Sequence, residues 1–306
     1  AEGPAGGRPA LERRAWAGAR RFLVLGGEDG SGGHDSTEVL NAAVMAFGPG
    51  PQMTSQRSSF ASADLGEGRL LAAGGSVGSR CLETTEVLDL EGMSFSPGPS
   101  MSSRRAACAA AKISEQQVLV LGGRDRSTRL DTTEVLNLNT MTFSPGPRMI
   151  SRRNMFAAAK LDASRLLVIG GHDGSSALDT TEILDLQSMT FSRGPRMRSE
   201  RFSCAASMID DEHLLVIGGV GTGNVRLDTT EVLDLDTMKF TSGPAMSTPR
   251  SGCAAMVLDE QRLIVAGGFD GTNRHTSTEI LDLSEWAFAA GPTLRIARGG
   301  CAAISC

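Results

Sequence analysis

The 306-residue sequence contains no tyrosine, and aromatic residues make up only 4% of it. Without tyrosine ligands, oxidation by a copper–tyrosyl radical is excluded. No apolar run approaches the roughly 18 residues needed to span a bilayer. Lys and Arg number 30 against 35 Asp and Glu, giving a net charge of −5. Such a chain has no overall basic field, so we expect neither nucleic acid nor a membrane as its partner.

Glycine, in contrast, is abundant, with 37 residues, and much of it follows a repeat. Gly-Gly doublets, each preceded by an apolar run, are separated by 48, 48, 48, 48 and 49 residues. The doublets begin at Gly26, Gly74, Gly122, Gly170, Gly218 and Gly267. Six doublets at this nearly constant spacing indicate a repeat architecture that covers nearly the whole chain.

Three further positions recur in every unit. The glutamates of a Thr-Glu pair are Glu38, Glu86, Glu134, Glu182, Glu231 and Glu279. An aromatic residue follows at Phe47, Phe95, Phe143, Phe191, Phe240 and Phe288. After a Gly-Pro come the arginines Arg57, Arg105, Arg153, Arg201, Arg250 and Arg298. These positions give every unit the same internal order.

Each unit reads as four short strands, which we call a to d. Strand a is a run of small residues such as 106–113, and strand b is the apolar run into the doublet, such as 165–171. Strand c alternates, as in 180–186, and strand d carries the Phe and ends at Gly-Pro. No segment shows capped helical periodicity, so the chain is predicted to be all-β. Four strands in a period near 48 are typical of a β-propeller.

The doublet, the aromatic residue and the period resemble the kelch repeat over residues 16–306. The sequence departs from that pattern where kelch repeats usually carry Tyr in strand c and Trp in strand d. The first position holds leucine, as at Leu40 and Leu88, and the second holds Phe. Both replacements keep apolar volume between blades. The resemblance implies an all-β, six-bladed kelch-type β-propeller with four antiparallel strands per blade.

The ends of the sequence indicate how such a ring closes. The first unit lacks strand a, and 297–306 repeats the strand-a pattern with no doublet after it. We therefore expect the C-terminal strand to pair into the first blade and remove an exposed edge. Residues 1–15 are expected to form a linker or disordered segment, and residues 16–306 the propeller. The predicted blade units are 16–51 with 298–306, 57–101, 105–149, 153–197, 201–246 and 250–294. Strand a, rich in Ala, Gly, Ser and Cys, is predicted to line the axis.

The six arginines are the candidate partner-binding residues. Each opens strand a, so Arg57, Arg105, Arg153, Arg201, Arg250 and Arg298 are predicted to ring the channel mouth, on the face that carries the b–c and d–a connections. Guanidinium groups bind carboxylates bidentately, and the resemblance to Kelch-like ubiquitin-ligase adaptors implies contact with acidic peptides. The alternative is that each arginine anchors its d–a turn by bonding backbone carbonyls, which would explain its presence in all six units equally well.

Cysteine and histidine give little reason to expect a metal or cofactor. Cys108, Cys204, Cys253 and Cys301 share one repeat position, where phenylalanine stands in the other two units. This pattern favours small buried hydrophobes over a metal cluster. His34 and His275 occupy equivalent loops and are interpreted as solvated loop residues. We predict no metal, no cofactor, a reducing compartment and a cytoplasmic location.

The favoured function is a protein-interaction module, monomeric and without catalytic residues. It would bind a partner protein or acidic peptide on the face of the b–c and d–a loops, as a substrate adaptor of a ubiquitin ligase does. One alternative is a kelch-type carbohydrate-active enzyme such as a sialic acid mutarotase, which would need acid and base residues placed asymmetrically. Another is a structural or actin-associated scaffold. The regularity of the units favours the interaction module.

Overall fold

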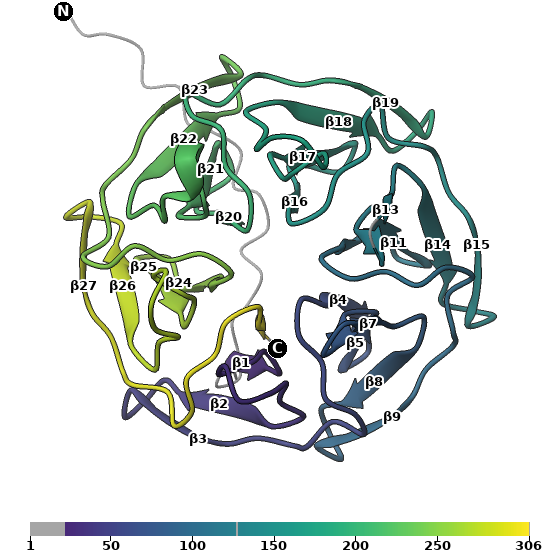
Figure 1. Cartoon of the computed structure of the whole chain (residues 1–306), viewed down its shortest axis with the longest axis horizontal. Helices are drawn as coiled ribbons and strands as arrows, with labels where there is room; N and C mark the ends of the chain where they lie inside the picture. The colour runs from purple at the N-terminus through teal and green to yellow at the C-terminus, as the bar shows by residue number, and fades with distance from the viewer. Residues whose placement is uncertain (1–21, 127, 306) are drawn as a thin grey trace, which may run out of the picture.

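Six four-stranded antiparallel sheets surround a central axis as the blades of a ring (Figure 1). The computed structural model describes residues 22–126 and 128–305. The predicted linker at residues 1–15 lies outside this described part. In every blade the sheet order follows the order expected for strands a, b, c and d. The all-β, six-bladed propeller predicted from the repeat is therefore confirmed.

In the first three blades the strands follow one another from the axis to the rim. Blade 1 contains β28 (Ala302–Ser305), β1 (Phe22–Leu25), β2 (Thr37–Asn41) and β3 (Ala46–Pro49). Blade 2 contains β4 (Ala61–Gly66), β5 (Arg69–Ala73), β8 (Thr85–Asp89) and β9 (Ser94–Pro97). Blade 3 contains β10 (Ala109–Ser114), β11 (Gln117–Leu121), β14 (Thr133–Asn137) and β15 (Thr142–Pro145).

The other three blades have the same order. Blade 4 contains β16 (Ala157–Lys160), β17 (Arg165–Ile169), β18 (Thr181–Asp185) and β19 (Thr190–Arg193). Blade 5 contains β20 (Ala205–Met208), β21 (His213–Ile217), β22 (Thr230–Asp234) and β23 (Lys239–Ser242). Blade 6 contains β24 (Ala254–Asp259), β25 (Arg262–Ala266), β26 (Thr278–Asp282) and β27 (Ala287–Ala290).

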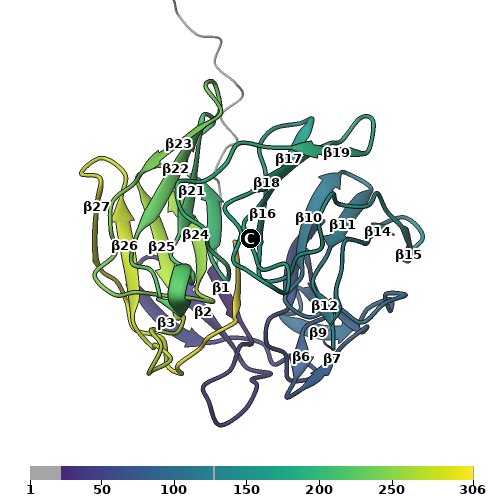
Figure 2. The same ribbon diagram turned by 45° about the horizontal axis from the view of Figure 1, so that its top comes forward.

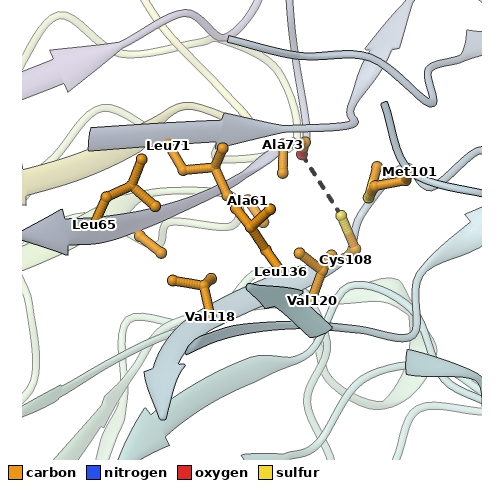
Figure 3. Close-up of a cluster of buried hydrophobic side chains, with 10 residues drawn as sticks. Ala61, Leu65, Leu71, Ala73, Met101, Cys108, Val118, Val120 and Leu136 are labelled. Carbon is orange, nitrogen blue, oxygen red and sulfur yellow. Dashed lines mark hydrogen bonds between the residues drawn. The ribbon is translucent and has the colours of Figure 1, made fainter. Parts of the chain in front are cut away.

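The core lies between neighbouring blades, where the two faces of each strand b are covered by adjacent sheets. In strand β11, for example, Val118, Leu119, Val120 and Leu121 are all fully buried. Figure 3 shows one such cluster, in which Leu71 and Met101 of blade 2 pack with Val118 and Val120 of blade 3. A strand with both faces covered is expected to be a continuous apolar run, which is the pattern in every unit.

The ring closes as predicted. Strand β28 pairs antiparallel with β1, with Leu25 opposite Ala302 and Phe22 opposite Ser305. Small residues of strand a lie innermost, and each strand a contacts those of the neighbouring blades. The C-terminus consequently lies near the axis in Figure 1. This pairing joins the two ends of the chain in one sheet, so no strand b or c is left at an open edge.

The Gly-Gly doublet is required because strand b ends beside two neighbouring backbones. Gly170 and Gly171 have φ values of +60° and +99°, in the left-handed region. A Cβ at Gly170 would collide with the carbonyl of Arg201 in the next blade. A Cβ at Gly171 would stand 2.8 Å from the carbonyl of Asn154. Both conformation and space therefore require glycine at these two positions.

The two ends of the ring carry different connections. All b–c and d–a connections lie at one end, which we call the loop face. All a–b and c–d turns lie at the other, which we call the hairpin face. The b–c connections include the hairpins β6 (Ser76–Val77)–β7 (Arg80–Cys81) and β12 (Arg124–Asp125)–β13 (Thr128–Arg129), and the short helix η1 (Thr222–Asn224). In Figure 2, β6, β7 and β12 appear at the lower side of the ring. Within the described residues, no helix has the length and apolar character needed to cross a bilayer.

Candidate binding face

The six repeated arginines lie at the loop face but below its surface. Each has at most 1% of its area exposed, and each is paired with the glutamate of the Thr-Glu pair in the same blade. The nitrogen–oxygen distances of these pairs run from 2.8 to 3.1 Å. The pairs are Arg57–Glu86, Arg105–Glu134, Arg153–Glu182, Arg201–Glu231, Arg250–Glu279 and Arg298–Glu38. The last pair joins the two ends of the chain.

Each guanidinium also holds the b–c connection of its own blade. Arg57 Nη1 donates hydrogen bonds to the carbonyls of Gly74 at 2.9 Å and Thr84 at 3.0 Å. Arg57 Nη2 donates to Thr84 Oγ1, and Nε donates to Glu86. In blades 4 and 5 the arginine bonds its glutamate through Nη2 instead. Through these hydrogen bonds the arginine side chain links the start of strand a to the b–c connection.

The backbone of the same arginine is bonded to the preceding blade. The amide of Gly27 donates to the Arg57 carbonyl at 2.8 Å, and the Arg57 amide donates to the His34 carbonyl at 3.1 Å. The corresponding pair of bonds occurs at all six arginines. Because the side chain bonds one blade and the backbone the previous one, each arginine couples two neighbouring blades.

Each paired glutamate closes the end of a d–a connection. Glu86 accepts hydrogen bonds from the amides of Thr54 and Ser55 and from the Ser55 hydroxyl, in addition to the bond from Arg57. Burial would raise the pKa of Glu86, but the bonds from Ser55 and Thr54 and the charge of Arg57 hold that pKa below its ordinary value. Glu86 therefore stays ionised and fixes the loop. This pairing was not predicted from the sequence, although the constant spacing between the Arg and Glu positions was a signal of it.

These contacts bear on the two roles expected for the arginines. A guanidinium with 0–1% exposure cannot contact a docked partner without leaving its carboxylate and carbonyls. Separating a buried ion pair is costly, because it leaves an uncompensated charge. The geometry therefore favours the alternative in which the six arginines anchor the d–a turns. Partner contact through their side chains stays a prediction that this arrangement does not support.

A collar of backbone hydrogen bonds surrounds the axis at the loop face. Each blade supplies one residue with φ between +52° and +63°, two positions after its arginine. The amide of each donates to the carbonyl of its counterpart in the preceding blade, over 2.6 to 2.9 Å. The six residues are Ser59, Ala107, Met155, Ser203, Gly252 and Gly300. The collar satisfies these backbone groups and fixes the innermost part of every d–a loop.

The side chains that remain available at the loop face break the sixfold pattern. Phe269 follows the doublet of blade 6, and its ring is flanked by two guanidinium groups. The Cζ atoms of Arg226 and Arg274 each lie 5.1 Å from the ring centroid. All three side chains are partly exposed. This stack combines an aromatic face with two cations in cation–π geometry. The other blades fill the position of Phe269 with glutamate, serine, arginine, histidine or valine. The glutamate is Glu28 of blade 1, and it forms an ion pair with Arg274.

Blades 3 to 5 add further groups on this face that do not recur in all six blades. The ring of His172 meets that of Phe202 edge to face, with 5.3 Å between centroids. The β12–β13 hairpin carries Arg124 and Arg129, which are partly exposed. Val225, beside η1, is 59% exposed. The extra residue of the fifth unit thus lengthens a loop on the same face as the Arg226–Phe269–Arg274 stack.

Charge is distributed unequally between the two faces. Among residues 22–126 and 128–305, and apart from the six buried pairs, the loop face carries thirteen arginines and eleven carboxylates, and the hairpin face carries six basic and sixteen acidic residues. The loop-face arginines are Arg80, Arg104, Arg124, Arg126, Arg129, Arg148, Arg152, Arg193, Arg196, Arg198, Arg226, Arg274 and Arg295, and the acids are Glu28, Asp29, Asp35, Glu83, Asp125, Asp131, Asp173, Asp179, Glu200, Asp228 and Asp270. The hairpin-face bases are Arg69, Lys112, Lys160, Arg165, Lys239 and Arg262, and the acids are Asp64, Glu67, Asp89, Glu91, Glu115, Asp162, Asp185, Asp210, Asp211, Glu212, Asp234, Asp236, Asp259, Glu260, Asp282 and Glu285. The net charges of these residues are +2 and −10, so the described part of the chain is electrostatically polarised along the axis of the ring.

Three of the four cysteines at the shared repeat position are buried, as expected of small hydrophobes, and Cys301 is partly exposed. Cys108, Cys204 and Cys253 are buried and free of disulfides. Burial raises the pKa of their thiols to about 11, 11 and 12. Thiols of this kind are neutral and poorly nucleophilic at physiological pH.

The two loop histidines are more buried than expected. His34 Nε2 lies 3.5 Å from Asp29, and His275 Nε2 lies 3.3 Å from Asp270, with only 16% of each histidine side chain exposed. Each therefore packs against the carboxylate of its own Asp-Gly turn. Among residues 22–126 and 128–305, no group of three or more metal-ligating side chains comes together.

The fold and the repeats together place the chain in a class of proteins, the six-bladed propellers built of kelch repeats. Within that class, the family model of the KLHDC2/KLHL20/DRC7 Kelch-repeats domain matches residues 96–268, more than half of the chain. The chain belongs to this family. Kelch propellers of this kind are in general protein-interaction modules. A search of the curated proteins found none that matches the chain.

Proposed function

We propose that the chain binds an acidic peptide segment of a partner protein on its loop face and acts there as a monomeric recognition module. The observation that carries the proposal is the Arg226–Phe269–Arg274 stack. It offers an aromatic face between two guanidinium groups, and aromatic residues and arginine dominate the energetics of protein interfaces. Because Arg274 is already paired with Glu28, an acidic ligand would have to share or replace that carboxylate, whereas Arg226 has no ion pair among the described residues. The buried Arg–Glu pairs hold the surrounding loops in place, which lowers the entropic cost of binding.

Charge polarity supports the same choice of face. An acidic segment is repelled by the −10 hairpin face and attracted to the arginine-rich loop face, so encounter is steered toward the stack. Steering of this kind weakens as salt screens exposed charges. Association with an acidic peptide should therefore slow as ionic strength rises.

The experiment uses a fluorescein-labelled glutamate-rich peptide and measures fluorescence anisotropy. The double variant Arg226→Gln/Arg274→Gln should weaken binding by about tenfold or more, since each lost charge-assisted contact contributes about 1.5–3 kcal/mol. Its melting temperature should match the wild type. The control Lys239→Gln, on the hairpin face, should bind normally. Equal affinity of the double variant and the wild type would refute the proposed site.

We further propose that this recognition selects the substrate of a ubiquitin ligase, as in the adaptors that the sequence resembles. The test needs a partner identified through the loop face. Raising the level of the natural protein in cells should shorten the half-life of that partner. The Arg226→Gln/Arg274→Gln variant should leave the half-life unchanged. A partner that binds in both assays but is never ubiquitinated would contradict the adaptor role and leave the binding role intact.

A further inference from the structure

The hairpin face carries one position where the repeat is broken and a large side chain is left exposed. Every c–d turn contains a residue with φ between +46° and +55°. In five blades this residue is methionine: Met45, Met93, Met141, Met189 and Met238. In blade 6 it is Trp286, which is 40% exposed. The fold does not require tryptophan here, because methionine occupies the same turn position in the other five blades. The exposure of Trp286 therefore points to a role other than packing.

The residue that faces this position from the preceding blade is also changed. Arg165 Nη1 of blade 4 reaches the Sδ atom of Met238 in blade 5 at 3.8 Å. Arg262 Nη1 of blade 6 reaches Met45 Sδ at 4.0 Å in the same way. Between blades 5 and 6 the equivalent residue is His213. Its Nδ1 lies 2.9 Å from the Asp210 carboxylate, just as Arg165 and Arg262 bond the equivalent Asp162 and Asp259. An imidazole is shorter than an arginine side chain, so His213 has no second arm with which to fill the notch.

The unfilled notch is a cavity of about 430 Å³ lined by His213, Trp286, Asp210, Asp234 and Lys239, among others. A second hollow of about 320 Å³ continues from it, shares Trp286 and Asp210, and adds Glu260. A third, of about 460 Å³, shares Asp210 and reaches the inner strands β20, β24 and β28. Together the hollows form a groove, the blade 5–6 groove, that runs from the rim of the ring toward its axis.

The chemistry of the groove specifies a cationic occupant. Asp210, Asp211, Asp234 and Glu260 line it against the single lysine Lys239. The surrounding hairpin face has a net charge of −10, so a basic segment is attracted over a long range. In blades 4 and 6 the natural occupant of the corresponding notch is the guanidinium of an arginine from the same chain. The indole of Trp286 offers the aromatic face that binds a Lys or Arg side chain best.

We propose that the blade 5–6 groove is a second docking site, which binds a basic peptide segment with a Lys or Arg side chain packed on Trp286. The occupant takes the place that Arg165 and Arg262 fill in their own notches. The site lies on the face opposite the proposed acidic-peptide site, so the two partners would be of opposite charge and could bind together. The ring would then bridge an acidic segment and a basic one.

The test uses Trp286 emission in a Trp16→Phe background, because the chain has only two tryptophans. The probe is acetyl-Lys-Leu-Arg-Leu-Lys-amide, and the control peptide carries glutamate at the three basic positions. The basic peptide should change the Trp286 emission saturably, and added salt should weaken its binding. The glutamate peptide should have no effect on the emission.

Two variants restore the repeat and are therefore expected to fold. His213→Arg refills the notch from within, and Trp286→Met supplies the residue of the other five blades. Each should weaken binding of the labelled basic peptide, measured by anisotropy, by about tenfold. Each should keep or raise the melting temperature. The loop-face variant Arg226→Gln should bind it as the wild type does.

Three results would overturn the proposal. The first is no saturable binding up to about 1 mM peptide, which corresponds to a binding free energy too weak to be specific. The second is unchanged affinity in both His213→Arg and Trp286→Met, which would place the peptide elsewhere on the acidic face. The third is equal binding of the glutamate peptide.

Discussion

The loop face and the hairpin face are held together by different means. At the loop face, every blade repeats one buried Arg–Glu pair, one pair of arginine backbone bonds to the preceding blade and one member of the backbone collar. At the hairpin face the turns are closed locally, as where Asp185 accepts bonds from the amides of Gln187 and Ser188. The residues that recur in every blade are thus the ones that stabilise the fold. The groups proposed to bind partners, the Phe269 stack and Trp286, are the ones that depart from it.

Removing a repeated arginine should have the largest effect. Arg250→Met leaves Glu279 buried without its cation and removes bonds to the carbonyls of Gly267 and Ser277. We expect a loss of about 3–5 kcal/mol in the free energy of unfolding, measured by urea titration. The exposed Arg198 of the same face is the control. Its replacement by methionine should change stability by less than about 0.5 kcal/mol, and equal losses would show that burial does not matter.

Glycine substitutions compare the two faces directly. Gly171→Ala, at the loop face, introduces a Cβ into contact with Asn154 and Phe156 at a φ of +99° and should cost about 3 kcal/mol. Gly68→Ala, in a hairpin-face turn, has φ +68° but open space around its Cβ, and should cost about 1 kcal/mol. Thermal and urea denaturation of both variants measure the difference. If Gly68→Ala lowered the free energy of unfolding as much as Gly171→Ala, the positive φ alone, and not the close contacts, would account for the loss of stability.

Low pH should lower the free energy of unfolding, because it protonates the buried glutamates of the loop face. The pKa of Glu86 is lowered below its ordinary value of 4.5 in the folded state, so its contribution is fully present above that pH and is lost as pH falls through the folded pKa. Glu86→Gln should therefore be less stable than the wild type at pH 7, and the gap should narrow as the pH drops below 4.5. Urea titrations at several pH values measure this gap. The exposed Glu285→Gln serves as the control, and a pH-independent gap would contradict the pairing.

Cysteine labelling should show the smallest effect in the folded state. The raised thiol pKa values and the burial of Cys108, Cys204 and Cys253 predict almost no reaction with iodoacetamide at neutral pH. Peptide mapping by mass spectrometry reads each site separately, and the same protein in urea provides full labelling. Rapid labelling of Cys204 in native buffer would mean that the inner strands open readily.

Much of the fold followed from the sequence because the repeat constrains it six times. The period, the doublets and the missing first strand a were sufficient to predict six blades and closure by β28. The partners of the arginines could not be predicted in the same way. A periodic sequence places Arg57 and Glu86 in register but equally allows Arg57 to pair with the glutamate of a neighbouring blade, and only the path of the d–a loop decides.

Departures from the repeat were harder to interpret. Phe269, Arg226 and Arg274 are spread over two b–c loops, and nothing in their spacing brings the guanidinium groups to the two sides of one ring. In the sequence, Trp286 stands at the c–d turn position where the other five units have methionine. Its meaning depends on His213, which is too short to fill the notch beside Trp286, and the hollow that results is shown only by the packing of blades 5 and 6.

The central claim is that repeated residues support the loop face and unrepeated residues bind the partner. The most direct test is the affinity of Arg250→Met for the glutamate-rich peptide, measured by anisotropy at a temperature where circular dichroism shows the variant fully folded. Because Arg250 is buried and serves only its own blade and the preceding one, the affinity should equal that of the wild type within about twofold, while the melting temperature falls. A folded Arg250→Met protein that binds about tenfold more weakly would place the repeated arginines in the binding site and contradict this account.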